Sequence, residues 1–311
     1  MSMKLEAQEP VWLIAGPTAS GKSRLALDLA TALEGEVINA DSMQVYSDLE
    51  VLTARPDPDA MAARPHHLYG VADAGEAWSV GRWLSEARRC LAEIATRRRP
   101  AVVVGGTGLY LRALTEGLAD IPPIPPAARE AAAAQLAALG EAPFRAKLAG
   151  FDPEAAARIE RGDALRLTRA TEVWLATGRS LSDWRRTSPA LLTPGQWRGV
   201  VVDLPRAELY RRCDLRLADM IANGALDEVK RLITRDLPPA SPALKALGVA
   251  PLAAHIRGEA SLEDALAQAQ TDTRRYAKRQ LTWLRNQTPD WPRLTPGPEG
   301  RIPVSSLPLG A

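Results

Sequence analysis

The feature that most constrains this chain is the loop Gly16-Pro-Thr-Ala-Ser-Gly-Lys-Ser23, between the apolar run Val11 to Ala15 and the helical pattern Arg24 to Leu33. Its glycines let backbone N–H groups wrap a phosphate, and the helix that follows adds the positive end of its dipole. Such a P-loop binds a diphosphate or triphosphate and is shared by kinases, ATP-binding NTPases and group transferases. The predicted phosphate-binding residues are Gly16, Pro17, Thr18, Ala19, Ser20, Gly21, Lys22 and Ser23, of which Lys22 supplies a charge and Ser23 can hold Mg²⁺.

Composition bounds the class of protein but not its reaction. The 311 residues can form one large domain or two smaller ones, and 46% hydrophobic and 24% charged residues are ordinary for a soluble enzyme. The net charge is only +2, so any cationic surface must come from clustering. Cys90 and Cys213 lie far apart without metal-ligand spacing, which predicts free thiols in a reducing cytoplasm. No apolar run is long enough to cross a membrane, and the first ten residues are too polar for a signal peptide.

Polar turns follow two further apolar runs of strand type. Glu36 to Ala40 ends in Asp41-Ser-Met-Gln44, and Ala101 to Val104 ends in Gly105-Gly-Thr107. Ligands bind at the carboxyl ends of the strands in an open parallel sheet, which is where the P-loop also lies. Asp41 can then ligate a metal, accept a proton from a substrate or cap a helix, and Thr107 can hydrogen-bond a substrate or cap a helix.

The sequence pattern changes near residue 119. Prolines interrupt the chain there, and helical patterns replace strand patterns until Gly199-Val-Val-Val-Asp203. We therefore predict an α/β fold, with a P-loop NTPase-like parallel sheet flanked by helices and an all-helical insertion domain. The expected parts are a core of residues 1–118 and 199–290, an insertion of residues 119–198 and a loose Pro-rich tail of residues 291–311.

The segment Ser261 to Asn286 is predicted to form one long helix, because it opens on a capping pattern and contains no Gly or Pro. Its second half concentrates basic residues, and Arg274, Lys278 and Arg285 share one stripe. That stripe is either a footprint for a phosphodiester backbone or a solvated helix face. The adjacent His66 and His67 are expected to have a structural role, because no third metal ligand is visible.

Taken together, the motifs resemble those of the tRNA dimethylallyltransferases, the isopentenyl transferases that act on tRNA, from Val11 to Asn286. The motifs that carry the resemblance are the P-loop, Asp41-Ser-Met-Gln-Val-Tyr46, Gly105-Gly-Thr-Gly-Leu-Tyr110, Leu165-Arg-Leu-Thr-Arg169 and Ala277-Lys-Arg-Gln-Leu-Thr-Trp-Leu-Arg285. The resemblance implies transfer of a dimethylallyl group from dimethylallyl diphosphate to N6 of the adenosine immediately 3′ of the anticodon, with release of diphosphate. ATP is not the substrate it implies.

The same resemblance implies roles for individual residues. Asp41 would orient the amino group and take its proton with Thr107 beside it, while Lys22, Arg216 and Mg²⁺ on Ser23 would act on the leaving diphosphate. The expected partner is the tRNA anticodon stem-loop, whose target base must be extruded. The residues implied in tRNA contact are Asp41, Ser42, Met43, Gln44, Thr107, Arg129, Leu165, Arg166, Leu167, Thr168, Arg169, Lys245, Lys278, Arg279, Gln280, Trp283 and Arg285.

The chain departs from the family pattern in one place. Where members commonly show an Ile-Gly-Tyr-Arg/Lys-like turn that touches tRNA, this chain reads Lys245-Ala-Leu-Gly-Val-Ala250, so Val249 and Ala250 replace the tyrosine and the base that follows it. It also lacks a Cys/His finger after Trp283, as do bacterial-type members. The alternatives are an isopentenyltransferase acting on free AMP or ADP, a small-molecule P-loop kinase and an RNA-binding protein with a vestigial P-loop. The protein is expected to be a cytoplasmic monomer with no membrane partner.

Overall fold

The structure, a computed structural model, describes residues 9–297 and 299–308 and contains a parallel sheet of six strands. The strands are β1 Val11–Ala15, β2 Glu36–Asn39, β3 His66–His67, β4 Ala101–Gly105, β5 Trp197–Val202 and β6 Arg293–Leu294, in the order β3-β2-β4-β1-β5-β6. All the neighbouring pairs are parallel. The central strands are nearly continuous apolar runs because helices cover a parallel sheet on both faces.

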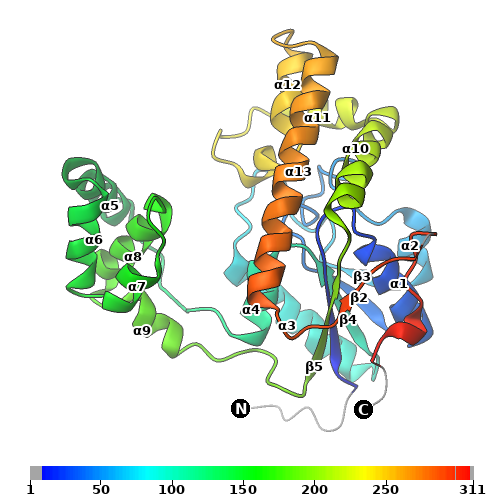
Figure 1. Ribbon diagram of the computed structural model, residues 1–311, viewed down its shortest axis with the longest axis horizontal. Helices are drawn as coiled ribbons and strands as arrows, with labels where there is room; N and C mark the ends of the chain where they lie inside the picture. Colours follow the sequence, from blue (N-terminus) through cyan, green and yellow to red (C-terminus); the bar gives the residue numbers. More distant parts are fainter. Residues whose placement is uncertain (1–8, 298, 309–311) are drawn as a thin grey trace. The chain divides into compact units, whose positions relative to one another are not determined.

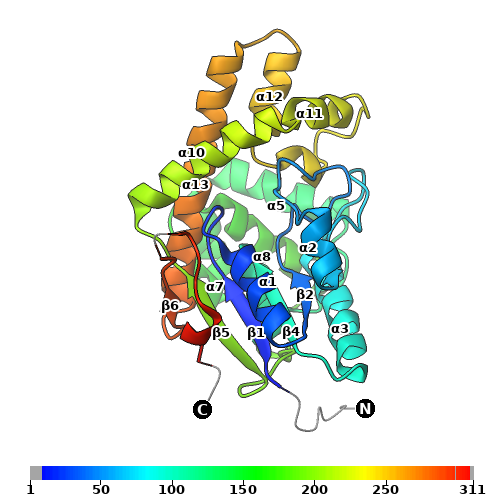
Figure 2. The same ribbon diagram turned by 90° about the vertical axis from the view of Figure 1, so that its right-hand side faces the viewer.

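The chain divides into two compact units, one formed by the chain up to Leu111 together with the chain from Leu192, and the other by Arg112 to Leu191. The helices of the first unit are α1 Lys22–Ala32, α2 Pro58–Ala63, α3 Val80–Thr96, α4 Gly108–Thr115 (which runs into the second unit), α10 Arg206–Ala222, α11 Ala225–Ile233, α12 Val249–Ile256 and α13 Leu262–Gln287. Two short 3₁₀ helices, η1 Pro242–Lys245 and η2 Val304–Ser306, complete it. Figures 1 and 2 show α11, α12 and α13 side by side. The predicted start of α13 is confirmed, since the Ser261 hydroxyl accepts from the Asp264 N–H.

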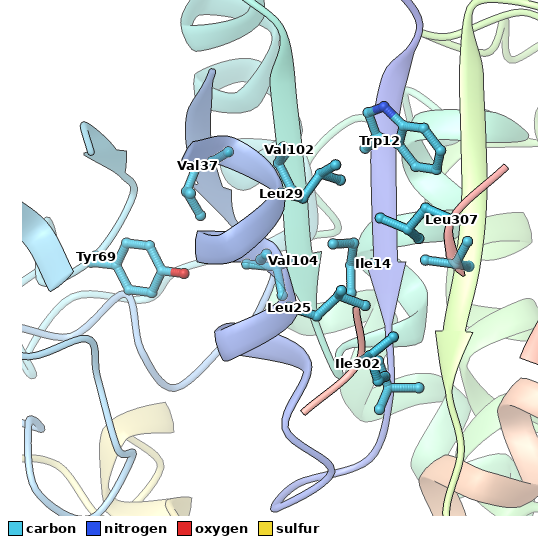
Figure 3. Close-up of a cluster of buried hydrophobic side chains, with 14 residues drawn as sticks. Trp12, Ile14, Leu25, Leu29, Val37, Tyr69, Val102, Val104, Ile302 and Leu307 are labelled. Carbon is cyan, nitrogen blue, oxygen red and sulfur yellow. The ribbon is translucent and has the colours of Figure 1, made fainter. Parts of the chain in front are cut away.

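Helix α1 packs on one face of the sheet and forms the main core with it (Figure 3). Leu25 and Leu29 of α1 meet Ile14 of β1 and Val102 and Val104 of β4, and all five side chains are buried. Burying a side chain of this size contributes roughly 2 kcal/mol. The P-loop that joins β1 to α1 is therefore anchored at both ends by the best-packed part of the unit.

The prediction of a loose tail after residue 290 is wrong. Strand β6 pairs with β5, and Ile302 and Leu307 are only 7% and 5% exposed in the core that α1 forms. Prolines confine regular secondary structure here to the two residues of β6 and the three of η2, but they do not prevent single apolar side chains from covering the edge of a core. The part of the tail beyond residue 308 lies outside the described residues.

The second unit is all-helical, as expected, but its boundaries fall at residues 112 and 191 rather than 119 and 198. Its helices are α5 Pro126–Leu139, α6 Glu141–Ala149, α7 Pro153–Arg158, α8 Ala164–Thr177 and α9 Leu181–Arg186, which gather into one bundle (Figure 1). Phe144, Leu148, Leu167, Val173 and Leu181 are buried at its centre. Strand β5 begins at Trp197, before the predicted strand, because its first residues already pair with β1. Among the described residues, no helix is long and apolar enough to cross a membrane.

Candidate active site

The P-loop offers free amide donors at its turn. Gly21 has a left-handed φ of 92°, which glycine adopts readily, and α1 begins directly after it. No side chain caps α1, and within the described residues no protein group accepts from the N–H groups of Gly21, Lys22 and Ser23. Orphan N–H groups at a helix N-terminus bind anions, so the loop is built to receive a phosphate.

Two cations from different elements reach this loop. Lys22 Nζ donates to Pro17 O at 3.2 Å, and Arg216 of α10 donates from Nη2 to Thr18 Oγ1 at 2.8 Å. Burial lowers the pKa of Lys22 to about 8, and the positive charge of Arg216 adds to this effect. Burial also lowers the pKa of Arg216. The Asp41 carboxylate offsets part of this effect on the pKa of both side chains, and a bound anion would offset more of it.

Asp41 closes a tight turn and leaves one carboxylate oxygen unused. Its Oδ1 accepts from Met43 N at 2.9 Å, and its own N–H donates to Asn39 Oδ1 at 2.8 Å. The Asn39 side chain in turn donates to Asp41 O and Leu68 O, which fixes the turn from both sides. Asp41 caps this turn rather than a helix, and its Oδ2 has no hydrogen-bond partner in the part of the chain that the structure describes.

Thr107 joins the turn after β4 to the turn after β2. Its Oγ1 accepts from Ser42 N at 3.0 Å and donates to Ser42 Oγ at 3.3 Å. The Thr107 carbonyl also accepts from Tyr110 N at 2.9 Å and from Leu111 N at 3.4 Å, so this threonine stands at the N-terminus of α4 while its hydroxyl faces Ser42. The turns that carry Asp41 and Thr107 are thus joined directly, which agrees with the prediction that the carboxyl ends of these strands lie at one edge of a parallel sheet.

Helix α13 contacts the P-loop and the turn that follows β4. Gln280 accepts from Thr18 N through Oε1 at 2.8 Å and donates from Nε2 to Gly106 O at 3.0 Å. The Trp283 ring lies directly against Gly108. The Gln280 side chain is 6% exposed and uses both polar ends inside the protein, and its predicted contact with tRNA stays a prediction.

Comparison with known proteins identifies the family. The IPP transferase family model matches residues 44–287, and the isopentenyl transferase model matches residues 9–66. A tRNA dimethylallyltransferase from Caulobacter sp. (strain K31) is 59% identical over 295 residues, which cover 95% of this chain and 94% of that protein. The chain belongs to the tRNA dimethylallyltransferase family. The family and the enzyme class predicted from the motifs are confirmed.

Further relatives within the tRNA dimethylallyltransferase family include one from Phenylobacterium zucineum (strain HLK1), 58% identical over 286 residues that cover 92% of each chain. Among solved structures, a tRNA isopentenylpyrophosphate transferase from Bacillus halodurans is 33% identical with a TM-score of 0.65, and covers 93% of this chain and 90% of its own. A eukaryotic dimethylallyltransferase acting on tRNA has a TM-score of 0.79 at 28% identity, over 93% of this chain and 74% of its own. The predicted α/β P-loop fold is confirmed.

Within the helical unit, α8 carries most of the residues that the family resemblance assigns to tRNA contact. Leu165 is 82% exposed on α8, so its side chain is accessible at the surface of the bundle. Leu167 is 0% exposed in the centre of the bundle, so the prediction that its side chain contacts tRNA is wrong. The Thr168 hydroxyl donates to Ala164 O within the helix. The exposed basic members of the predicted set here are Arg129, Arg166 and Arg169.

In the α/β unit, the predicted basic stripe on α13 is shorter than expected. Arg274 donates to both carboxylate oxygens of Asp214 of α10, at 2.8 and 2.9 Å, so it belongs to a helix–helix contact rather than to a free cationic face. Within this unit, the exposed cations of the predicted set that have no acidic partner among residues 9–297 and 299–308 are Lys245, Lys278, Arg279 and Arg285.

Two contacts near the Asp41 turn could not be inferred from the sequence. Gln44, predicted to contact tRNA, donates from Nε2 to Thr53 O and Ala54 O, which leaves its Oε1 available as an acceptor. Glu228 of α11 is buried, and its carboxylate accepts from the backbone N–H groups of residues 50, 51 and 52. A glutamate inside a helical pattern carries no signal that it will cap a loop so distant in sequence.

Proposed function

We propose that the protein transfers the dimethylallyl group of dimethylallyl diphosphate to N6 of the adenosine immediately 3′ of the anticodon in tRNA. The observation that carries the proposal is the meeting of two complementary sets of groups at one sheet edge. The P-loop amides, Lys22 and Arg216 suit a leaving diphosphate. Asp41, with an unused carboxylate oxygen, and Thr107 suit an amine acceptor. Its relatives are named for this reaction.

In the proposed reaction, the allylic carbon–oxygen bond of the donor breaks and its electron pair leaves with the diphosphate. The free N–H groups of Gly21, Lys22 and Ser23 and the Lys22 ammonium stabilise the charge that develops on the leaving oxygen. The N6 lone pair of adenine forms the new carbon–nitrogen bond, and the carboxylate of Asp41 takes the N6 proton. Thr107 holds the Asp41 turn in register through Ser42.

Mg²⁺ fits this site as an ion held largely by the substrate. Ser23 is exposed, and its hydroxyl has no protein partner within the described part of the chain. Residues 9–297 and 299–308 contain no cluster of three His, Cys, Asp or Glu side chains able to hold a metal alone. Mg²⁺ commonly takes one or two protein oxygens and completes its shell with phosphate and water, where it neutralises developing charge. We propose Ser23 as its protein ligand.

The test is to incubate the purified protein with Mg²⁺ and labelled dimethylallyl diphosphate in parallel with an unmodified tRNA anticodon stem-loop, AMP, ADP or ATP. Label in the stem-loop at the adenosine after the anticodon supports the proposal. Label only in AMP or ADP would assign the protein to the free-nucleotide enzymes, and ATP turnover without prenyl transfer would indicate a kinase. A stem-loop with guanosine at the target position is the matched control and should take up no label.

We also propose that the protein acts as a monomer in the cytoplasm. The groups assigned to the donor and the acceptor all come from one chain, so the chemistry requires no second copy. Sedimentation of the protein with and without the stem-loop tests this proposal, because a 1:1 complex is expected and a complex with two protein chains would contradict it.

A further inference from the structure

The Gln280 side chain is the one group on α13 that bridges the two loops of the active site. Its Oε1 accepts from Thr18 N in the P-loop, and its Nε2 donates to Gly106 O in the turn that carries Thr107. The two partners lie 262 and 174 residues away in sequence. A buried side chain must both accept and donate to make this bridge, which a primary amide can do and a carboxylate or alkyl group cannot.

The surroundings are fitted to this amide. A Cβ atom on Gly106 would lie 2.2 Å from Gln280 Nε2 and 3.2 Å from Gly16 O, so only glycine lets the turn approach the bridge. Thr18 is held a second time, because its hydroxyl accepts from Arg216. The P-loop backbone is therefore fixed between α13 and α10 at Thr18, three positions before the first of the amides that face the phosphate.

The same stretch of α13 presents cations to solvent. Lys278 and Arg279 precede Gln280 directly, are exposed, and have no acidic partner among the described residues. Helix α13 runs without Gly or Pro from Leu262 to Gln287, so it moves as a rod rather than bending at Gln280. Binding of an RNA backbone at Lys278 and Arg279 would thus change the position of the Gln280 amide.

We infer that Gln280 is a positioning residue that couples RNA binding on α13 to the geometry of the diphosphate site. The inference rests on the proposed function and extends it. The coupling is reciprocal: bound diphosphate tightens RNA binding by the same factor by which bound RNA tightens diphosphate binding. Gln280 itself touches neither ligand, and without it each ligand binds its own site with its separate affinity.

The experiment compares Gln280→Leu and Gln280→Glu with a control, Gln268→Leu, which alters an exposed glutamine on the same helix. Calorimetry measures the affinity for inorganic diphosphate with and without an unmodified stem-loop, and single-turnover assays measure transfer. Gln280→Leu should lower the rate of transfer by about 10- to 100-fold, which is typical of a slightly misplaced reacting group. It should remove the mutual tightening yet leave the affinity for the stem-loop alone within about twofold.

Gln280→Glu separates positioning from simple loss of packing. Its ionised carboxylate can still accept from Thr18 N but faces Gly106 O without a donor, whereas its protonated form regains an O–H donor. The ratio of variant to wild-type rate should therefore rise as pH falls. If the ratio does not depend on pH, the donor that faces Gly106 O has no role in transfer, and that result would overturn the inference.

Two other results would also overturn it. If the affinity for the stem-loop alone falls as much as the rate, Gln280 is an RNA contact. If the rate and the mutual tightening match those of the Gln268→Leu control, the bridge has no role in coupling. If wild-type protein transfers nothing to RNA while Gln280→Leu still alters diphosphate affinity, the proposed function fails and the positioning of the P-loop stands. Circular dichroism melting of each variant shows whether it is folded.

Discussion

Replacing Lys22 with methionine should stabilise the ligand-free protein while abolishing its activity. The pKa of Lys22 is lowered from its ordinary 10.5 to about 8, chiefly by burial. At about 1.4 kcal/mol per unit, holding this lysine charged at pH 7 costs at most about 3 kcal/mol. The variant loses the hydrogen bond to Pro17 O, worth about 1 kcal/mol. The expected net gain in the free energy of unfolding is therefore about 2 kcal/mol.

The pH dependence identifies the cause. Because the pKa of Lys22 is lower in the folded state, the unfolded chain binds more protons between pH 8 and 10.5, and wild-type stability rises across that window. The methionine variant lacks this contribution. The stability gap between the two proteins should thus shrink by about 1 kcal/mol from pH 7 to pH 9.

The assay is urea unfolding in phosphate-free buffer, followed by tryptophan fluorescence, since most of the tryptophans lie in the α/β unit. Inorganic diphosphate provides an internal control. Diphosphate should raise the free energy of unfolding of the wild type according to its affinity and leave that of the variant unchanged. The difference in stability between the two proteins should therefore shrink or change sign. Equal stability of the two proteins at pH 7, or a gap that stays constant to pH 9, would refute the reasoning.

Three other predictions concern different parts of the site. Asp41→Asn should reduce transfer at least 100-fold with tRNA affinity nearly unchanged, as measured by single-turnover rates and filter binding; a large affinity loss with retained turnover would contradict its role as base. Lys278→Ala combined with Arg279→Ala should make the salt dependence of tRNA binding shallower by between one and two units of slope, and an unchanged slope would exclude phosphate contacts there. Glu228→Ala should destabilise the α/β unit by about 3 kcal/mol in urea unfolding, because one buried and two partly buried N–H groups lose their acceptor; a loss under about 1 kcal/mol would mean that water replaces it.

The position of a site residue could be predicted where a local sequence pattern determines it. The P-loop, Asp41 and Thr107 could be predicted because each directly follows a buried apolar strand, and the carboxyl ends of parallel strands must meet at one edge. Prediction failed where partners are distant in sequence. Gln280 lay in a segment assigned to RNA contact, and nothing in that segment indicates that one residue turns inward to Thr18.

The sequence was misleading in two places, the Pro-rich end of the chain and the motif on α8. A Pro-rich tail suggests irregular chain, but Ile302 and Leu307 are single apolar anchors that no periodic pattern reveals. Leu165 and Leu167 lie in one short motif, yet a helix sends residues two apart to different faces, so one is exposed and the other buried. Strand β3 has only two residues and is too short for a sequence pattern to predict.

The parallel pairing of β1 with β5 has a consequence for how the protein is made. Strand β1 and its P-loop are synthesised before the helical unit, but their neighbour β5, the Gln280 bridge and the covering Ile302 all follow that unit, in the stretch from Leu192. The helical unit, by contrast, has all of its core within Arg112 to Leu191 and can fold as soon as it leaves the ribosome. At roughly 5 to 20 residues per second, β5 and α13 appear several seconds after the helical unit. During that time the nascent chain carries one folded unit and an unfinished sheet, whose exposed apolar strands make it a natural client for chaperones.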